Sequence, residues 1–177
     1  MIRSSRSTGL VLALAALVLL ACQTPMAVRT DLSESADFSG LPSYSWAGEE
    51  TSTQERLRGV TDQDLDRWIR AAVDANLAEA GYERRADGGD FLVQYDVAIE
   101  TQKRQQQVVM DRAGGSRSVT VSYREGSLVL EALAADTRLP LWRGWAEAEI
   151  NEYLKPEARE ARIGEAVGRI LARFPRR

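Results

Sequence analysis

The stretch FLVQYDVAI at residues 91–99 decides the fold class of this chain. Its apolar side chains recur at every second position, and Gln94 and Asp96 stand between them. Period-two alternation predicts a β-strand with one face buried and the other in water. Residues 119–123, VTVSY, repeat the pattern. The sequence therefore predicts a sheet that is covered on one side only.

Three further segments extend this sheet. Residues 128–132 continue the alternation around Glu131, and a strand at 141–148 follows the turn at 136–140. An earlier short strand is expected at 43–47. Because strands so close in sequence pair through hairpins, we expect mostly antiparallel neighbours.

Two segments outside the strands have helical periodicity. In the first, Thr61 is a candidate N-cap and Gly81 ends the apolar repeat. In the second, Pro156 suits the first turn and Pro175 prevents continuation. The predicted class is α+β: an antiparallel sheet of about five or six strands with two helices packed on one face, a two-layer sandwich.

Residues 100–118 depart from the regular pattern. They contain a polar run at 101–107, several bases and the Gly114-Gly115 pair. One interpretation is the protruding tip of a hairpin, and we prefer it because charge runs are usually solvated. The alternative is a basic finger that touches an anionic partner, lipid head groups or glycan.

The N-terminus has the layout of a lipoprotein signal. Arg3 and Arg6 precede the aliphatic run at 10–20, and Leu19-Leu20-Ala21 leads into Cys22, the only cysteine of the chain. A run of about eleven residues spans only ~17 Å as a helix, too short for a hydrocarbon core of roughly 30 Å. We expect a cleaved signal at 1–21 and covalent lipid on Cys22, which anchors the protein in a membrane. The residue after Cys22 is Gln23, whereas an aspartate there would resemble an inner-membrane retention signal. An outer-membrane location facing the periplasm is therefore favoured, and the inner membrane is the alternative.

Composition excludes several functions. Loss of residues 1–21 would remove two bases and no acid, leaving 21 bases and 26 acids, a net charge of about −5. Nucleic acid is therefore not expected as a partner. The chain has no histidine, which excludes histidine triads and histidine metal sites, and a lipidated cysteine offers no thiolate. We expect a protein that is not an enzyme and that has no cofactor, no metal and no catalytic residue. A pair of carboxylates converging in a cleft is the one catalytic device that the composition leaves open.

Several short motifs resemble one family. They are Asp37-Phe38-Ser39, Tyr44-Ser45-Trp46, Gly81-Tyr82, Asp90-Phe91-Leu92-Val93, Gly126-Ser127-Leu128-Val129-Leu130, Leu141-Trp142-Arg143-Gly144-Trp145-Ala146 and the ending Ile170-Leu171 to Phe174-Pro175. Together they resemble the bacterial envelope lipoproteins with domain of unknown function 4136, over nearly the whole mature chain. The resemblance implies a location and a fold but no activity, and it implies a first strand near 27–31. The expected division is then a signal at 1–21, the lipidated cysteine and a short tether at 22–26, and one domain at 27–177.

A possible interaction surface follows from strand geometry. Trp142 and Trp145 are an odd number of residues apart, so they point to opposite faces of the sheet. If Trp142 is buried under the helices, Trp145 lies on the open face, where we expect Arg124, Glu131 and Arg143 beside it. Glu131 and Trp145 are also the positions at which the chain departs from the family pattern, whereas Trp46 and Trp68 are assigned to packing.

The leading hypothesis is a non-enzymatic interaction or scaffold module that presents this face to another envelope protein. The alternative is a lipoprotein that binds a small molecule, lipid or glycan in the groove between sheet and helices. A covering loop, or the 100–118 segment, would bury Trp145 and remove the motive for the first hypothesis. The oligomeric state is open.

Overall fold

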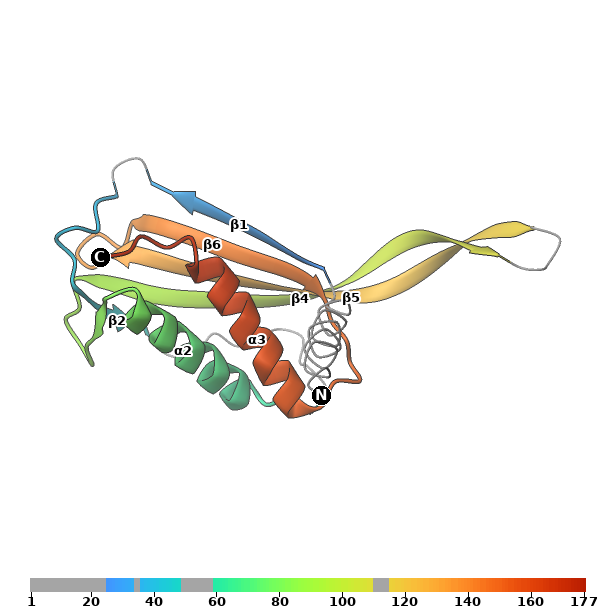
Figure 1. The fold of residues 1–177 in the computed structure, drawn as a ribbon, viewed down its shortest axis with the longest axis horizontal. Helices are drawn as coiled ribbons and strands as arrows, with labels where there is room; N and C mark the ends of the chain where they lie inside the picture. The colour runs from blue at the N-terminus through green and yellow to red at the C-terminus, as the bar shows by residue number, and fades with distance from the viewer. Residues whose placement is uncertain (1–24, 34–35, 49–58, 110–114) are drawn as a thin grey trace, which may run out of the picture.

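The structure is a computed structural model that describes residues 25–33, 36–48, 59–109 and 115–177. The predicted signal, Cys22, most of the tether, Arg112 and Gly114 lie outside the described residues. The elements, in chain order, are β1 (Met26–Leu32), β2 (Ser43–Trp46), α2 (Asp62–Glu79), β3 (Glu83–Arg84), β4 (Phe91–Val109), β5 (Ser116–Ala134), β6 (Pro140–Glu149) and α3 (Pro156–Leu171) (Figure 1).

The six strands form one sheet in the order β1-β6-β5-β4-β2-β3. β4, β5, β6 and β1 pair antiparallel, as expected, but β2 is parallel to both β3 and β4. The sheet is therefore mixed at one edge. The reason is the connection, because α2 carries the chain back across the sheet between β2 and β4 and allows both strands to run in the same direction.

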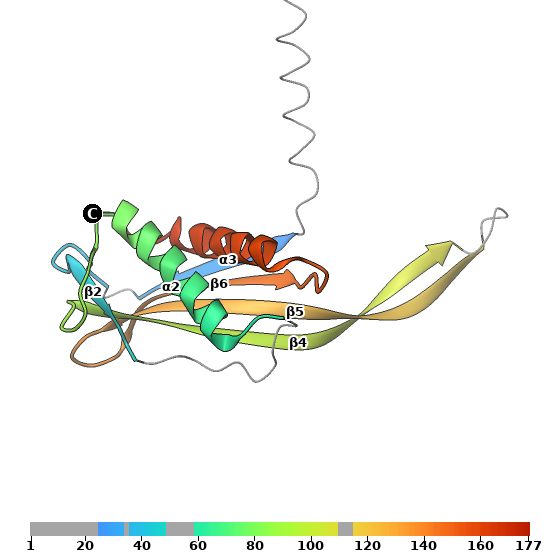
Figure 2. The same ribbon diagram turned by 90° about the horizontal axis from the view of Figure 1, so that it is seen from below.

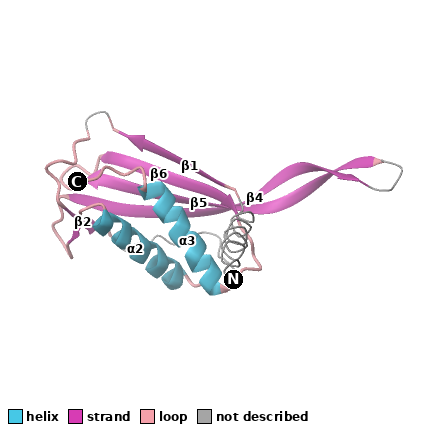
Figure 3. Ribbon diagram, in the orientation of Figure 1, coloured by secondary structure: helices cyan, strands magenta, loops and turns pink. Residues whose placement is uncertain are grey.

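Both described helices lie on the same face of the sheet, and the described residues place no helix on the other face (Figures 2 and 3). α2 begins where the sequence predicts, since the Thr61 hydroxyl accepts a hydrogen bond from the Asp64 amide at 3.0 Å. α3 begins at Pro156, whose fixed φ suits a first turn. The predicted α+β fold, with two helices on one face, is confirmed. Neither described helix is long and apolar enough to cross a membrane.

An aromatic cluster closes the core at the end of the sheet where the chain terminates. Phe174, just after α3, packs edge-on against Phe38 at 5.0 Å, Tyr82 at 5.5 Å and Trp142 at 4.9 Å between ring centroids. Phe91 lies beneath these rings and is fully buried. Such edge-to-face pairs add about 0.5–1.5 kcal/mol each beyond the apolar area they bury.

β4 and β5 continue far beyond the rest of the sheet as a twisted two-stranded ribbon (Figure 1). We call residues 101–109 and 116–124 of this ribbon the arm. The strands expected at 119–123 and 128–132 are one continuous strand, β5, which pairs with β4 without a break from Ser116 to Ala134. The predicted hairpin tip at 100–118 is confirmed, although most of it is regular strand.

Candidate interaction surface

The face of the sheet turned away from the helices is the candidate surface, and we call it the open face. On β6, Trp142 and Ala146 are buried under the helices, and Trp145 between them points the other way and is partly exposed. The register places Trp145 opposite Arg29 of β1 and Val129 of β5. The predicted division of the two tryptophans between the two faces therefore follows from the pleat.

Glu131 and Arg143 lie beside Trp145 on the open face, as the sequence predicts. They are paired across β5 and β6, and Arg143 Nε lies 2.9 Å from Glu131 Oε1. Gln94 of β4 donates a hydrogen bond to the other oxygen of Glu131 at 2.7 Å. Glu131 is thus held from both sides, and Arg143 is oriented along the surface next to the indole.

Arg124 is not part of this group. It lies an odd number of residues from Glu131 on the unbroken strand β5, so the two side chains leave opposite faces of the sheet. Its guanidinium instead pairs with Glu152, in the loop after β6, at 2.6 Å. The expectation that Arg124 lies beside Trp145 is wrong.

A shallow hollow of about 210 Å³ lies next to the tryptophan on the open face, lined by Ala98, Glu100, Gln102, Glu125, Ser127 and Glu147. We call it the acidic hollow. Glu100 and Glu125 are direct partners across β4 and β5, so two like charges face each other. Arg29 lies 3.7 Å from Glu147, and Gln102 donates to Glu100 at 3.1 Å. Within the described residues, no group of three or more acidic or cysteine side chains is arranged to hold a metal ion.

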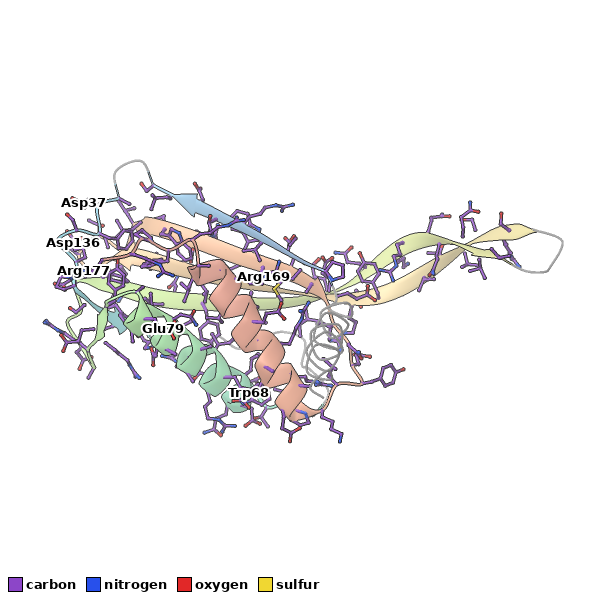
Figure 4. The ribbon with its side chains drawn as sticks, viewed as in Figure 1. Asp37, Trp68, Glu79, Asp136, Arg169 and Arg177 are labelled. Carbon is purple, nitrogen blue, oxygen red and sulfur yellow. The ribbon has the colours of Figure 1, made fainter. Side chains whose placement is uncertain are left out.

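A second candidate site lies between the sheet and the helices, at the end where β1 begins. It is an apolar cavity of about 150 Å³, lined mainly by aliphatic side chains of both layers, among them Met26, Val97, Ala148, Ile150 and Ile163. Arg159 of α3 lies at its edge, buried, and donates to the carbonyl oxygens of Leu154 at 3.0 Å and Glu152 at 2.8 Å. Arg169 of α3 (labelled in Figure 4) donates to the Met26 carbonyl oxygen at 3.1 Å, which fixes β1 against the helix.

The buried polar groups at the β2 edge have structural partners. Asp74 of α2 accepts from the Tyr44 hydroxyl at 2.7 Å and the Trp46 indole at 3.2 Å, and Arg84 lies 2.8 Å away. Burial, followed by the hydrogen bond to Asp74, raises the pKa of Tyr44 far above its ordinary value. Hydrogen bonds from the side chain and backbone of Ser43 lower the pKa of Asp90.

The two remaining tryptophans pack as the sequence predicts. Trp46 stands edge-on to Tyr95, with ring centroids 6.2 Å apart, and Arg70 lies 4.4 Å above the Trp46 ring. Trp68 is buried on the inner side of α2. These two rings therefore fill space between the layers.

Sequence reasoning missed both the acidic hollow and the apolar cavity. The hollow had a detectable signal, because Glu100 and Glu125 end the two segments that flank the 101–124 hairpin and so must lie opposite each other. The cavity had none, because Ile150 and Leu154 fall in a loop without periodicity. The position of the cavity depends on how α3 packs against β1.

These features define a class of protein: a small α+β domain with two helices on one side of its sheet and a polar, tryptophan-bearing face on the other. The family model for DUF4136, a domain of unknown function, matches residues 28–176, and the chain belongs to that family. The resemblance of the sequence motifs to domain of unknown function 4136 is thereby confirmed. A search of the curated proteins gave no match.

Solved structures share the fold. A DUF4136 family protein from Bacteroides thetaiotaomicron is 17% identical, with 85% of this chain and 96% of that chain covered and a TM-score of 0.54. PelC from Paraburkholderia phytofirmans, a dodecamer, is 12% identical, with 86% of this chain and all of that chain covered and a TM-score of 0.50. A PDZ domain protein from Parabacteroides distasonis is 12% identical over 95% of this chain, with a TM-score of 0.54, and this chain spans 40% of its length.

Proposed function

We propose that this protein is a lipid-anchored protein of the bacterial envelope that binds another protein through its open face and has no catalytic activity. The anchor is diacylglycerol on Cys22, after removal of residues 1–21, and the domain faces the periplasm from the outer membrane. The signal layout and the single cysteine support the anchor. β1 begins at Met26, so three residues would connect Cys22 to the sheet, and the four Cα–Cα steps reach about 14 Å.

The anchor is tested by labelling cells that produce the full chain with radioactive palmitate. The wild-type protein is expected to incorporate the label and to sediment with outer membranes. The Cys22→Ser variant is expected to lose the label and keep an uncleaved or unmodified N-terminus, which mass spectrometry of the N-terminal peptide reads directly. Equal labelling of the two proteins would exclude Cys22 as the attachment site.

The observation that carries the binding proposal is Trp145, partly exposed on a helix-free sheet face between Arg29 and Arg143. Tryptophan and arginine are the residues most enriched at interface hot spots. The salt bridge to Glu131 already holds Arg143 in place, which lowers the entropy lost on binding. The absence of histidine from the sequence supports a role in binding rather than in catalysis.

The binding proposal is tested by cross-linking the full-length protein in intact cells and identifying what is captured. The Trp145→Ala and Arg143→Ala double variant is expected to lose the captured protein. Tyr153→Ala is the matched control, because Tyr153 is 95% exposed and lies in the loop after β6. Capture that survives the double variant would exclude the open face.

A second candidate function follows from the apolar cavity. An apolar cavity of about 150 Å³ suits a six-carbon ligand such as benzene, and most drug-sized molecules need roughly 300 Å³ or more. The ligand chemistry that fits is the end of an acyl chain, and the apolar lining does not suit a glycan.

This candidate is tested with a fluorescent fatty acid added to the purified full chain. Ala148→Leu fills the cavity and is expected to abolish binding, whereas Ala98→Leu on the open face is expected to leave it unchanged. Binding that Ala148→Leu does not reduce would place the fatty acid elsewhere.

A further inference from the structure

Among the described residues, the arm contacts the body only near its base, where Arg124 pairs with Glu152 and Arg104 with Glu149. Beyond Glu125, β5 pairs only with β4, because the register with β6 ends at the Glu125–Glu149 pair. Figure 1 shows the arm projecting from the end of the body. An isolated two-stranded ribbon is marginally stable in water, and three strands or a packed face are needed for independent stability. The arm therefore requires a surface to rest on.

The two sides of the arm differ in character. The side that continues the open face carries Val119, Val121 and Tyr123 of β5, with Arg117 near the tip. The other side carries the serine and threonine residues of β5 at positions 116, 118, 120 and 122. Four bases and no acid occur in residues 101–109 and 116–124. Two of these bases, Arg104 and Arg117, lie on the side with the valines, so that side offers both apolar and cationic groups to a partner.

Two of the three carboxylates of the acidic hollow, Glu100 and Glu125, form no ion pair with a described residue, whereas Glu147 pairs with Arg29. Glu100 and Glu125 face each other across the strands, an arrangement that destabilises a sheet. Arg143 is engaged with Glu131, and Arg29 with Glu147 in the hollow itself, so neither arginine is paired with Glu100 or Glu125. A guanidinium from outside the chain would relieve the repulsion.

The spacing of the two surfaces matches. On the arm, Arg117 and Val121 lie four residues apart on one side of β5, and on the open face Glu125 and Val129 lie four residues apart. Both intervals span about 13 Å along a strand. When an arm is laid along the open face with Arg117 above Glu125, Val121 of the arm lies above Val129 of that face. The register partner of Val129 is Trp145.

We propose that the arm of one copy of this chain packs on the open face of a second copy, with Arg117 in the acidic hollow and the valines against Val129 and Trp145. This inference rests on the proposed function, since it names the partner of the same face. The contact joins two different surfaces, so each copy gives its arm to one neighbour and receives the arm of another, which generates a ring or a chain of copies.

A membrane surface is a weaker match for the arm. Recognition of anionic lipid relies on clusters of four to eight bases. On the apolar side of the arm, Arg104 is already bound to Glu149 at 2.7 Å and stacked 4.8 Å from the Tyr123 ring. Arg117 alone does not make such a cluster.

The first test is disulfide cross-linking of the full-length protein in intact cells. A chain with Val121→Cys and Val129→Cys is expected to form a ladder of linked copies on non-reducing gels. The matched control replaces Thr120, on the other side of the arm, with cysteine in place of Val121, and it is expected to form none. A ladder of equal strength in the control, a dimer from Val121→Cys alone, or no ladder would each overturn the proposal.

The second test exchanges charges and reads the mass of the purified full chain by native mass spectrometry. Arg117→Glu and Glu125→Arg are each expected to weaken assembly on the order of 10-fold or more, because like charges then meet. The chain that carries both changes is expected to assemble again. An equal mixture of the two single variants is expected to assemble again as alternating copies, because every contact between unlike copies then joins opposite charges.

The outcomes separate this inference from the proposed function. If capture of another protein depends on Trp145 but no ladder forms, the open face binds a different partner and the arm inference fails alone. If the ladder also forms in cells that produce the Cys22→Ser variant, the copies assemble without the lipid anchor. If the wild-type protein binds anionic vesicles, Arg117→Glu loses that binding, and Val121→Cys with Val129→Cys gives no ladder, then the arm binds lipid instead.

Discussion

Replacement of Gly144 by alanine tests the close packing between β6 and α3. Gly144 faces the helices, and a Cβ added there would lie 2.5 Å from Ile170 Cγ2 and 2.5 Å from Trp142 Cη2. Carbon atoms in van der Waals contact are about 3.5–4.0 Å apart, so both neighbours would have to move by about 1 Å. Ile170 is fully buried and Trp142 is 3% exposed.

Neither neighbour has free space to move into, because the Trp142 ring is itself packed against Phe174 at 4.9 Å. Overpacking in a core costs about 1–3 kcal/mol, and two close contacts place this site at the upper end. Alanine recovers about 0.5–1 kcal/mol by restricting the unfolded chain. The expected net loss in the free energy of unfolding is about 2 kcal/mol.

Urea unfolding followed by tryptophan fluorescence measures this loss as a shift of the midpoint by about 1 M, for a denaturant slope of about 2 kcal/mol/M. The matched control is Gly164→Ala in α3, where no atom lies within 4 Å of the added Cβ. The control is expected to gain about 0.5–1 kcal/mol, the helical preference of alanine over glycine. A loss below about 0.5 kcal/mol in Gly144→Ala would refute the packing of Trp142 over this glycine.

Three further predictions concern the β2 edge of the sheet. Gly89→Ala is expected to prevent folding of a normal β2 edge, because its Cβ would lie 2.3 Å from the backbone of Tyr44, and circular dichroism with the melting temperature measures this. Tyr44→Phe is expected to cost about 1.5–3 kcal/mol in urea unfolding, because it removes a buried hydrogen bond to the Asp74 carboxylate, and a wild-type midpoint would contradict that bond. The side-chain and backbone hydrogen bonds from Ser43 hold the pKa of Asp90 below its ordinary 3.8, so they stabilise the fold above about pH 4, and this contribution is lost as the pH falls through the lowered pKa. Asp90→Asn is expected to flatten the acid side of the stability curve, and an unchanged curve would show that Asp90 does not contribute.

The alternation of residues was enough to predict the layers and the division of side chains between faces. The pleat places Trp142 and Trp145 on opposite faces, and the N-cap Thr61 and the first-turn Pro156 mark the helix starts. These features depend on neighbours within a few positions, which the sequence shows directly.

Features that depend on distant partners were not predictable. In the sequence, Gly126 separates the two stretches of alternation. In the structure the strand continues through it, and Ile150 packs over Gly126 with side-chain atoms 3.2–3.3 Å from where a Cβ would lie. Treating the strand as two pieces is what placed Arg124 on the wrong face. The sequence predicts a protruding hairpin here but not its regular strands, because the glutamine run of β4 has no alternation and only the pairing with VTVSY reveals them.

The position of Phe174 has a consequence for the order of events during synthesis. Its ring completes the cluster with Phe38, yet the two residues are separated by most of the chain. The Arg177 amide likewise donates to the Ala80 carbonyl oxygen at 3.1 Å. A nascent chain that has not reached residue 174 therefore lacks the ring that closes the end of the core. Contacts so remote in sequence slow folding, and in a polypeptide still emerging from the ribosome this end of the core stays open.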